Sequence, residues 1–220
     1  ESAWREMARQ IAHEIKNPLT PMKLSVQYLQ KAWDDKAPDW EQRLKRFSRT
    51  IIEQIDSLSI IASEFSDFAK MPRSKFQVVD LDEIINRSIT LYKDTTEVTF
   101  EYSSTKAFVW ADKEQLLRVF NNLIKNSIQA MPDPHKGIIR VETETTDHEH
   151  IVTFKDNGIG ISEEQQPRIF YPNFTTKSSG MGLGLAMVKS IIENAKGNIS
   201  FESQVGVGTT FIIRLPAWTE

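Results

Sequence analysis

Apolar residues recur at steps of three and four along the first 70 positions, which is the spacing of one helix face. The first series is Trp4, Met7, Ile11, Ile15, Leu19, Met22, Val26, Leu29 and Trp33. A polar stretch at 34–39 interrupts it, and Asp39 is placed to cap a second helix. The second series is Leu44, Phe47, Ile51, Ile55, Leu58, Ile61 or Ala62, Phe65 and Phe68, and Met71-Pro72 ends it. We therefore predict two helices of about 30 residues in an antiparallel hairpin.

A single hairpin of this kind has too small an apolar core to be stable alone. Pairing two hairpins into a four-helix bundle buries both apolar series. We therefore expect a homodimer formed through this region. The alternative is that both series pack on the C-terminal part of the same chain.

The pattern becomes mixed after residue 75. Short apolar runs predict single strands at 76–79, 98–102 and 108–110, and two strand hairpins, one of 137–145 with 150–156 and one of 198–202 with 209–215. Helical spacing predicts helices at 81–92, 112–131 and 182–194. Asp112 is the expected N-cap of its helix. This order predicts an α+β sandwich with helices on one face of a mixed sheet. We place the domain boundary between residues 72 and 73, giving domains 1–72 and 73–220.

Composition narrows the possible functions. The 220 residues carry a net charge of -3, so the basic excess typical of a nucleic-acid-binding protein is missing. The chain has no cysteine, which excludes disulfides, thiolate zinc sites and a cysteine nucleophile. It has no apolar run near the roughly 20 residues of a membrane helix. Because it begins at Glu1 without a signal pattern, we interpret it as a fragment of a longer protein.

A histidine and an acidic residue stand together in the first predicted helix. His13 lies about 200° around the helix from Ile11, so it is expected to face solvent. The Glu14 carboxylate could hold the imidazole in one tautomer while the other ring nitrogen attacks an electrophile. Asn17 lies one turn further on the same face. Two prolines follow inside the helix, at 18 and 21, and predict a bend there.

Two asparagines share one face of the predicted helix at 112–131. Asn122 and Asn126 are four residues apart. Asparagine is a poor residue for a helix interior, so two on one face indicate a polar ligand. Amide oxygens suit a hard cation such as Mg²⁺ that is already bound to phosphates.

Two glycine clusters follow, and each has a different chemical use. Asp156 stands at the end of a strand, where its carboxylate can accept a hydrogen bond from an exocyclic amine. Gly158 and Gly160 would let the backbone approach a flat ring. The second cluster, Gly180, Gly182 and Gly184, runs into a helix, and amides at a helix start bind phosphate. Lys177, just before this cluster, could reach a terminal phosphate.

These segments, in this order, resemble the sensor histidine kinases of two-component signalling. Residues 13–20 are similar to the phosphoacceptor box, 122–126 to the N box, 156–160 to the first glycine box, 169–174 to the phenylalanine box and 180–184 to the second glycine box. The Asn-Pro-Leu-Thr-Pro run and the short segment between the glycine boxes look most like the nitrogen-regulation branch. Gln129 replaces a lysine often found in this family, which leaves phosphate neutralisation to Lys125 or Lys177. Asn173 replaces a phenylalanine of the phenylalanine box.

The resemblance implies an ATP-binding domain of the type shared with gyrase, heat-shock protein 90 and MutL proteins. It implies that His13 is the phosphoacceptor, Glu14 its base and Asn17 a residue that positions water for dephosphorylation. By the same resemblance Asn126 would bind Mg²⁺, Asn122 would contact phosphate and Asp156 would bind adenine.

The resemblance also implies partners and a location. The kinase would pass its phosphoryl group to an aspartate of a response regulator, and would also dephosphorylate that regulator. The fragment would be the cytoplasmic part of a membrane-anchored sensor of the inner membrane. Two other functions compete: an ATPase clamp, which has no use for the His13-Glu14 pair, and a dimerisation scaffold with an inactive nucleotide site, against which the intact motifs argue.

Overall fold

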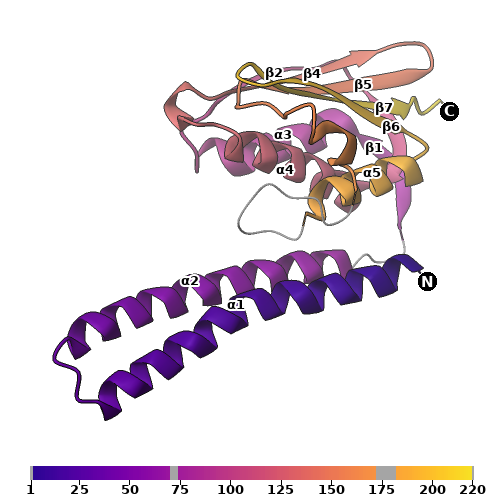
Figure 1. Ribbon diagram of the computed structural model, residues 1–220. Coiled ribbons are helices and arrows are strands. Elements are labelled where there is room, and N and C mark those ends of the chain that lie inside the picture. Colours follow the sequence, from indigo (N-terminus) through magenta and orange to yellow (C-terminus); the bar gives the residue numbers. More distant parts are fainter. Residues whose placement is uncertain (1, 70–73, 172–181, 220) are drawn as a thin grey trace. The chain divides into compact units, whose positions relative to one another are not determined.

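The computed structural model describes residues 2–69, 74–171 and 182–219 (Figure 1). These residues form two compact units, one helical and one built on a sheet. Each unit is described by itself below.

The first unit is a helical hairpin. Helix α1 (Ser2–Asp34) and helix α2 (Trp40–Ala69) run antiparallel, as the apolar spacing predicts. At the connection the rings of Trp33 and Trp40 meet edge to face, with centroids 5.0 Å apart. Helix α2 starts directly after Asp39, whose carboxylate accepts a 2.8 Å hydrogen bond from the Arg43 guanidinium. Both prolines lie inside α1, which continues through them.

The second unit alternates helices and strands in the predicted order. Its elements are β1 (Phe76–Asp80), α3 (Leu81–Lys93), β2 (Thr99–Ser103), β3 (Phe108–Asp112), α4 (Lys113–Gln129), a 3₁₀ turn (Pro134–Lys136), β4 (Ile138–Thr145), β5 (Glu149–Asp156), a second 3₁₀ turn (Gln166–Arg168), α5 (Gly184–Asn194), β6 (Asn198–Gln204) and β7 (Gly208–Pro216). Asp112 is the N-cap of α4: its carboxylate accepts from the amides of Glu114 at 2.9 Å and Gln115 at 3.0 Å. The predicted cap is therefore confirmed.

The strands form a mixed sheet with the order β2-β4-β5-β7-β6. Strand β2 is parallel to β4, and the other neighbours are antiparallel. Strands β1 and β3 form a separate antiparallel pair. Helices α3, α4 and α5 cover one face of the larger sheet (Figure 1). The expectation of an α+β sandwich is confirmed.

The core lies between this sheet face and the helices. Alternate residues of the central strands point inward, as a strand's period of two requires. Val141 of β4 is paired with Phe154 of β5, and both are fully buried. The Phe154 ring stacks on Phe120 of α4 with centroids 5.5 Å apart. This contact ties α4 to the middle of the sheet, and it fixes the position of the polar residues further along both elements.

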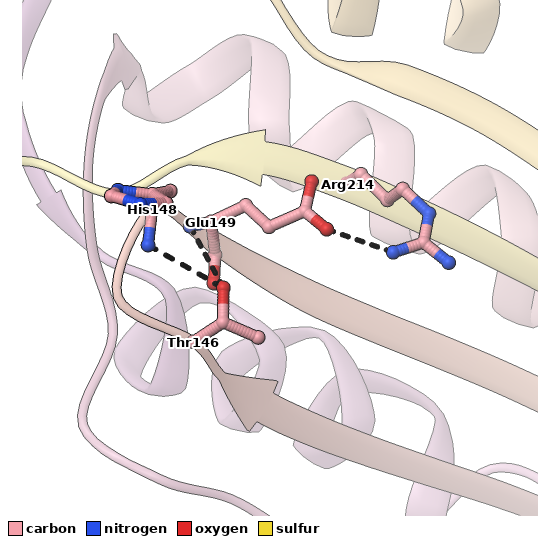
Figure 2. A network of polar contacts seen from close by, with 4 residues as sticks. All are labelled: Thr146, His148, Glu149 and Arg214. Carbon is pink, nitrogen blue, oxygen red and sulfur yellow. Dashed lines mark hydrogen bonds and ion pairs between the residues drawn. The ribbon is translucent and has the colours of Figure 1, made fainter.

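A polar network closes the hairpin between β4 and β5 (Figure 2). The Thr146 hydroxyl donates to the Glu149 carbonyl at 3.0 Å and accepts from the Glu149 amide at 3.1 Å. Arg214 of β7 then donates to the Glu149 carboxylate at 2.9 Å. The network links β5 to its turn and to β7, at the opposite end of β5 from Asp156.

Candidate functional site

Asp156 is a buried acid of the second unit that accepts three hydrogen bonds. It is the last residue of β5 and only 4% exposed. Its Oδ1 accepts from the amides of Gly158 at 2.9 Å and Thr209 at 3.2 Å, and its Oδ2 accepts from the Ser127 hydroxyl at 3.0 Å. Burial raises the pKa of Asp156 above its ordinary value, while these three hydrogen bonds favour the ionised form and oppose the rise. The result is a fixed acceptor at the end of a strand.

The first glycine cluster lies tightly against its surroundings. A Cβ on Gly158 would lie 2.8 Å from the carbonyl oxygen of Ala130, and the amide of Ile159 donates to that same oxygen at 2.9 Å. Gly160 has a φ of +72°, and a Cβ there would lie 2.1 Å from the carbonyl oxygen of Gln204. The glycines therefore allow this loop to pack directly against the end of α4 and the end of β6.

The asparagine pair lies on one face of α4, as its spacing predicts. The Asn126 amide nitrogen donates to Asn122 Oδ1 at 3.2 Å. In an amide side chain the oxygen is the acceptor and the nitrogen the donor, so the Asn126 carbonyl oxygen is the atom that would ligate a cation. Lys125, between the two asparagines, is exposed. Asn126 is followed directly by Ser127, whose hydroxyl bonds the Asp156 carboxylate, so α4 carries both the asparagine pair and a donor to Asp156.

The last glycine of the second cluster, Gly184, lies against Asn122. A Cβ on Gly184, the first residue of α5, would lie 2.4 Å from Asn122 Oδ1. Gly182 has a φ of +62°, which favours glycine. Lys177 and Gly180 lie outside the described residues, as does the 172–174 part of the phenylalanine box. Among the residues described, the structure therefore brings Asn122, Asn126 and Gly184 together, and the helix of the two asparagines also carries the Ser127 donor to Asp156.

The predicted phosphoacceptor lies in the first unit, on α1. His13 and Asn17 are exposed, and Glu14 is partly buried. Exposure of His13 agrees with its expected position away from the apolar face. The bend predicted at the prolines stays a prediction.

Three residues with a part in the site were not assigned from the sequence. Ser127 and Thr209 hold the Asp156 carboxylate. The side chain of Asn157 accepts from the Ile138 amide at 2.8 Å and donates to the Lys136 carbonyl at 2.9 Å, so it supports the start of β4. The position of Ser127 directly after Asn126 was an available signal, whereas the approach of Thr209 depends on how β7 pairs with β5.

The residues present fit a magnesium ion held through a nucleotide. In the described part of the chain, no group of three or more His, Cys, Asp or Glu side chains could hold a metal. A magnesium ion bound mainly by phosphates and water needs few protein ligands, and one amide oxygen is a suitable one. No helix among the described residues is long and apolar enough to cross a membrane.

Comparison with known proteins decides the family. Residues 3–73 match the His Kinase A (phospho-acceptor) domain, and residues 111–219 match the histidine kinase-, DNA gyrase B- and HSP90-like ATPases. The solved catalytic domain of histidine kinase ThkA is 30% identical, with a TM-score of 0.58 over 64% of this chain and 95% of that chain. The chain belongs to the sensor histidine kinases. Its second unit is the ATP-binding domain of that family.

Full-length sensor kinases among its relatives are similar over nearly the whole chain. Nitrogen regulation protein NtrY of Azorhizobium caulinodans is 34% identical over 90% of this chain and 27% of its own length. The histidine-protein kinase AtoS of Escherichia coli is 33% identical over 96% of this chain and 34% of its own length. A structure of ThkA in complex with response regulator TrrA covers 97% of this chain and 61% of the ThkA chain, at 27% identity and a TM-score of 0.71. The chain thus spans about a quarter to a third of these two relatives.

Proposed function

We propose that this chain is the kinase core of a sensor that uses ATP to phosphorylate His13 and then passes the phosphoryl group to an aspartate of a response regulator. The observation that carries the proposal is the presence, in one chain, of an exposed His13 beside Glu14 and of a buried acceptor, Asp156, bonded to the helix that carries two asparagines on one face. An ATPase clamp has no use for the first feature, and a dimerisation scaffold has none for the second.

The nucleotide would be held by the residues around Asp156. The Asp156 carboxylate would accept a hydrogen bond from the adenine amine, and the backbone at Gly158 and Gly160 would lie along the base. Asn122 and Lys125 would contact the phosphates. Lys177 and the glycines at 180, 182 and 184 would complete the phosphate site. The Asn126 oxygen would ligate Mg²⁺, which neutralises phosphate charge when bound.

His13 would act as the nucleophile. Its Nε2 lone pair forms the bond to the γ-phosphorus while the bond from phosphorus to the bridging oxygen breaks, and the electron pair leaves with ADP. Glu14 would accept a hydrogen bond from Nδ1–H, which keeps Nε2 unprotonated and stabilises the imidazolium that develops. Since phosphoryl transfer depends mainly on positioning, His13 and the nucleotide must be brought into line by movement between the two domains, 1–72 and 73–220.

The proposed partners follow from the hairpin and from the relatives. In this single chain, Ile15, Leu19 and Val26 of α1 remain 38%, 47% and 47% exposed. A second hairpin would cover these side chains in a homodimeric four-helix bundle. ThkA has been crystallised in complex with a response regulator, which supports a partner of that class here. Asn17 would position water when the kinase dephosphorylates the regulator.

The finer placement of the protein is also a proposal. We infer that the full-length protein is a membrane-anchored sensor whose cytoplasmic part includes this chain. Assignment to the nitrogen-regulation branch is supported by 34% identity to NtrY, but the sensor kinase ZraS of Escherichia coli is equally identical.

Incubation with γ-labelled ATP and Mg²⁺ tests the proposal. An acid-labile, base-stable label on the wild-type chain and its loss in His13→Gln, with ATP affinity retained, is the expected result. Asn126→Ala or Asp156→Ala should remove ATP binding while the dimer persists in sedimentation. Labelling that survives in His13→Gln, or normal ATP affinity in both site variants, would refute the assignment.

A further inference from the structure

We propose that Ser127 is a positioning residue for base recognition: its hydroxyl holds the Asp156 carboxylate in the orientation that accepts a hydrogen bond from an exocyclic amine. The inference rests on the proposed role of Asp156 in binding adenine. It assigns to Ser127 a contribution to the choice of nucleobase.

The geometry separates the two oxygens of Asp156. Oδ1 accepts from two backbone amides, those of Gly158 and Thr209. Oδ2 accepts from the Ser127 hydroxyl at 3.0 Å. Ser127 is 1% exposed, so water has no ready access to replace its hydroxyl. Oδ2 is therefore held by a side-chain donor, while Oδ1 is held by backbone donors.

The hydroxyl has two effects on the acceptor. Donors on both oxygens restrict rotation of the carboxylate, because a turn would break bonds on each side. A hydrogen bond to the ionised form also favours that form against the effect of burial. Without Ser127 the carboxyl group would protonate at a higher pH, and a protonated oxygen can donate where an amine needs an acceptor.

Substitution of Ser127 combined with a change of ligand tests this role. We would measure dissociation constants of ATP and of purine riboside triphosphate, which lacks the 6-amino group, for the wild type and Ser127→Ala. A hydrogen bond to a charged group is worth about tenfold or more in affinity. We expect Ser127→Ala to weaken the binding of ATP by about tenfold and the binding of the analogue by much less, so that the preference for ATP over the analogue becomes smaller.

The pH dependence supplies a second readout. The loss of ATP affinity in Ser127→Ala should be larger at about pH 6 than at about pH 8, because a carboxyl with one donor fewer protonates more readily. Equal weakening of both ligands, with the same loss at both pH values, would show a merely structural role and overturn the inference. Unchanged ATP affinity would overturn it as well.

The chain contains a matched control. Ser88 on α3 is also fully buried, and its hydroxyl has no hydrogen-bond partner among the described residues. Ser88→Ala should leave both dissociation constants unchanged. If Ser127→Ala does not fold, Ser127→Cys keeps a group of similar size with a weaker donor, and should show a smaller loss of the same kind. If the wild type fails to bind ATP, the proposed function fails. If the wild type binds ATP and Ser127→Ala binds both ligands as the wild type does, the proposed function stands and only this inference fails.

Discussion

The turn between β6 and β7 offers two glycines that separate backbone strain from steric conflict. Gly206 and Gly208 have φ values of +77° and +134°. A Cβ on Gly206 would meet nothing within 4 Å, whereas a Cβ on Gly208 would lie 1.9 Å from the Asp156 carbonyl oxygen. Gly206→Ala therefore changes the backbone preference alone, and Gly208→Ala adds a clash at the proposed base site.

The two substitutions are expected to lower the free energy of unfolding by different amounts. Gly206→Ala should lower the free energy of unfolding by about 1–2 kcal/mol, the cost of left-handed backbone for a residue with a Cβ. In Gly208→Ala the new Cβ and the Asp156 carbonyl oxygen must move apart to about 3.3 Å. Since Thr209 is the next residue, that movement breaks its 3.2 Å bond to Asp156 Oδ1. Backbone strain and the lost charged hydrogen bond together give about 3–5 kcal/mol.

Urea unfolding of both variants, with hydrogen exchange resolved over residues 198–216, measures these losses in the affected strands. Titration with ATP measures the effect on binding. We expect Gly208→Ala to weaken ATP binding by about tenfold or more and Gly206→Ala to leave it unchanged. Equal destabilisation by the two variants, or unchanged ATP binding in a folded Gly208→Ala, would refute the reasoning that this contact shapes the site.

Two further predictions concern single side chains. Burial lowers the pKa of His150, so the unfolded chain binds a proton at higher pH than the folded chain, and stability falls as the pH drops below about 6.5. The slope of unfolding free energy against pH should be shallower in His150→Asn between about pH 5 and pH 7; an unchanged slope would contradict this. Asn157→Ala should cost about 1–2 kcal/mol and speed exchange of the Ile138 amide. Asn157→Asp, which keeps the acceptor, should protect that amide, and equal exchange in both variants would show that the bond contributes nothing.

Local signals were sufficient to predict the elements. The hairpin follows from apolar spacing and the polar break at 34–39, and α4 follows from a carboxylate cap at Asp112. The shared face of Asn122 and Asn126 follows from helix geometry alone. Each of these features depends on residues a few positions apart, so the sequence specifies it directly.

The contacts of Asp156 could not be predicted in the same way. Its donors Ser127 and Thr209 lie 29 and 53 residues away in the chain. The second contact exists because β7 pairs with β5 in a register that sets Thr210 against Lys155. Register across a sheet depends on packing of the whole unit. Likewise Asn157, which looks like part of an ordinary Asn-Gly turn, supports a strand that begins 19 residues earlier.

Strand β7 lies between β5 and β6, although it is the last of the described strands to leave the ribosome. A nascent chain that has emerged only as far as residue 207 already contains Asp156, both asparagines and the first glycine cluster. It lacks the Thr209 amide, and one edge of β5 has no neighbour. ATP binding at this site thus requires that β7 has been synthesised, and until then the open edge of β5 is exposed to other chains.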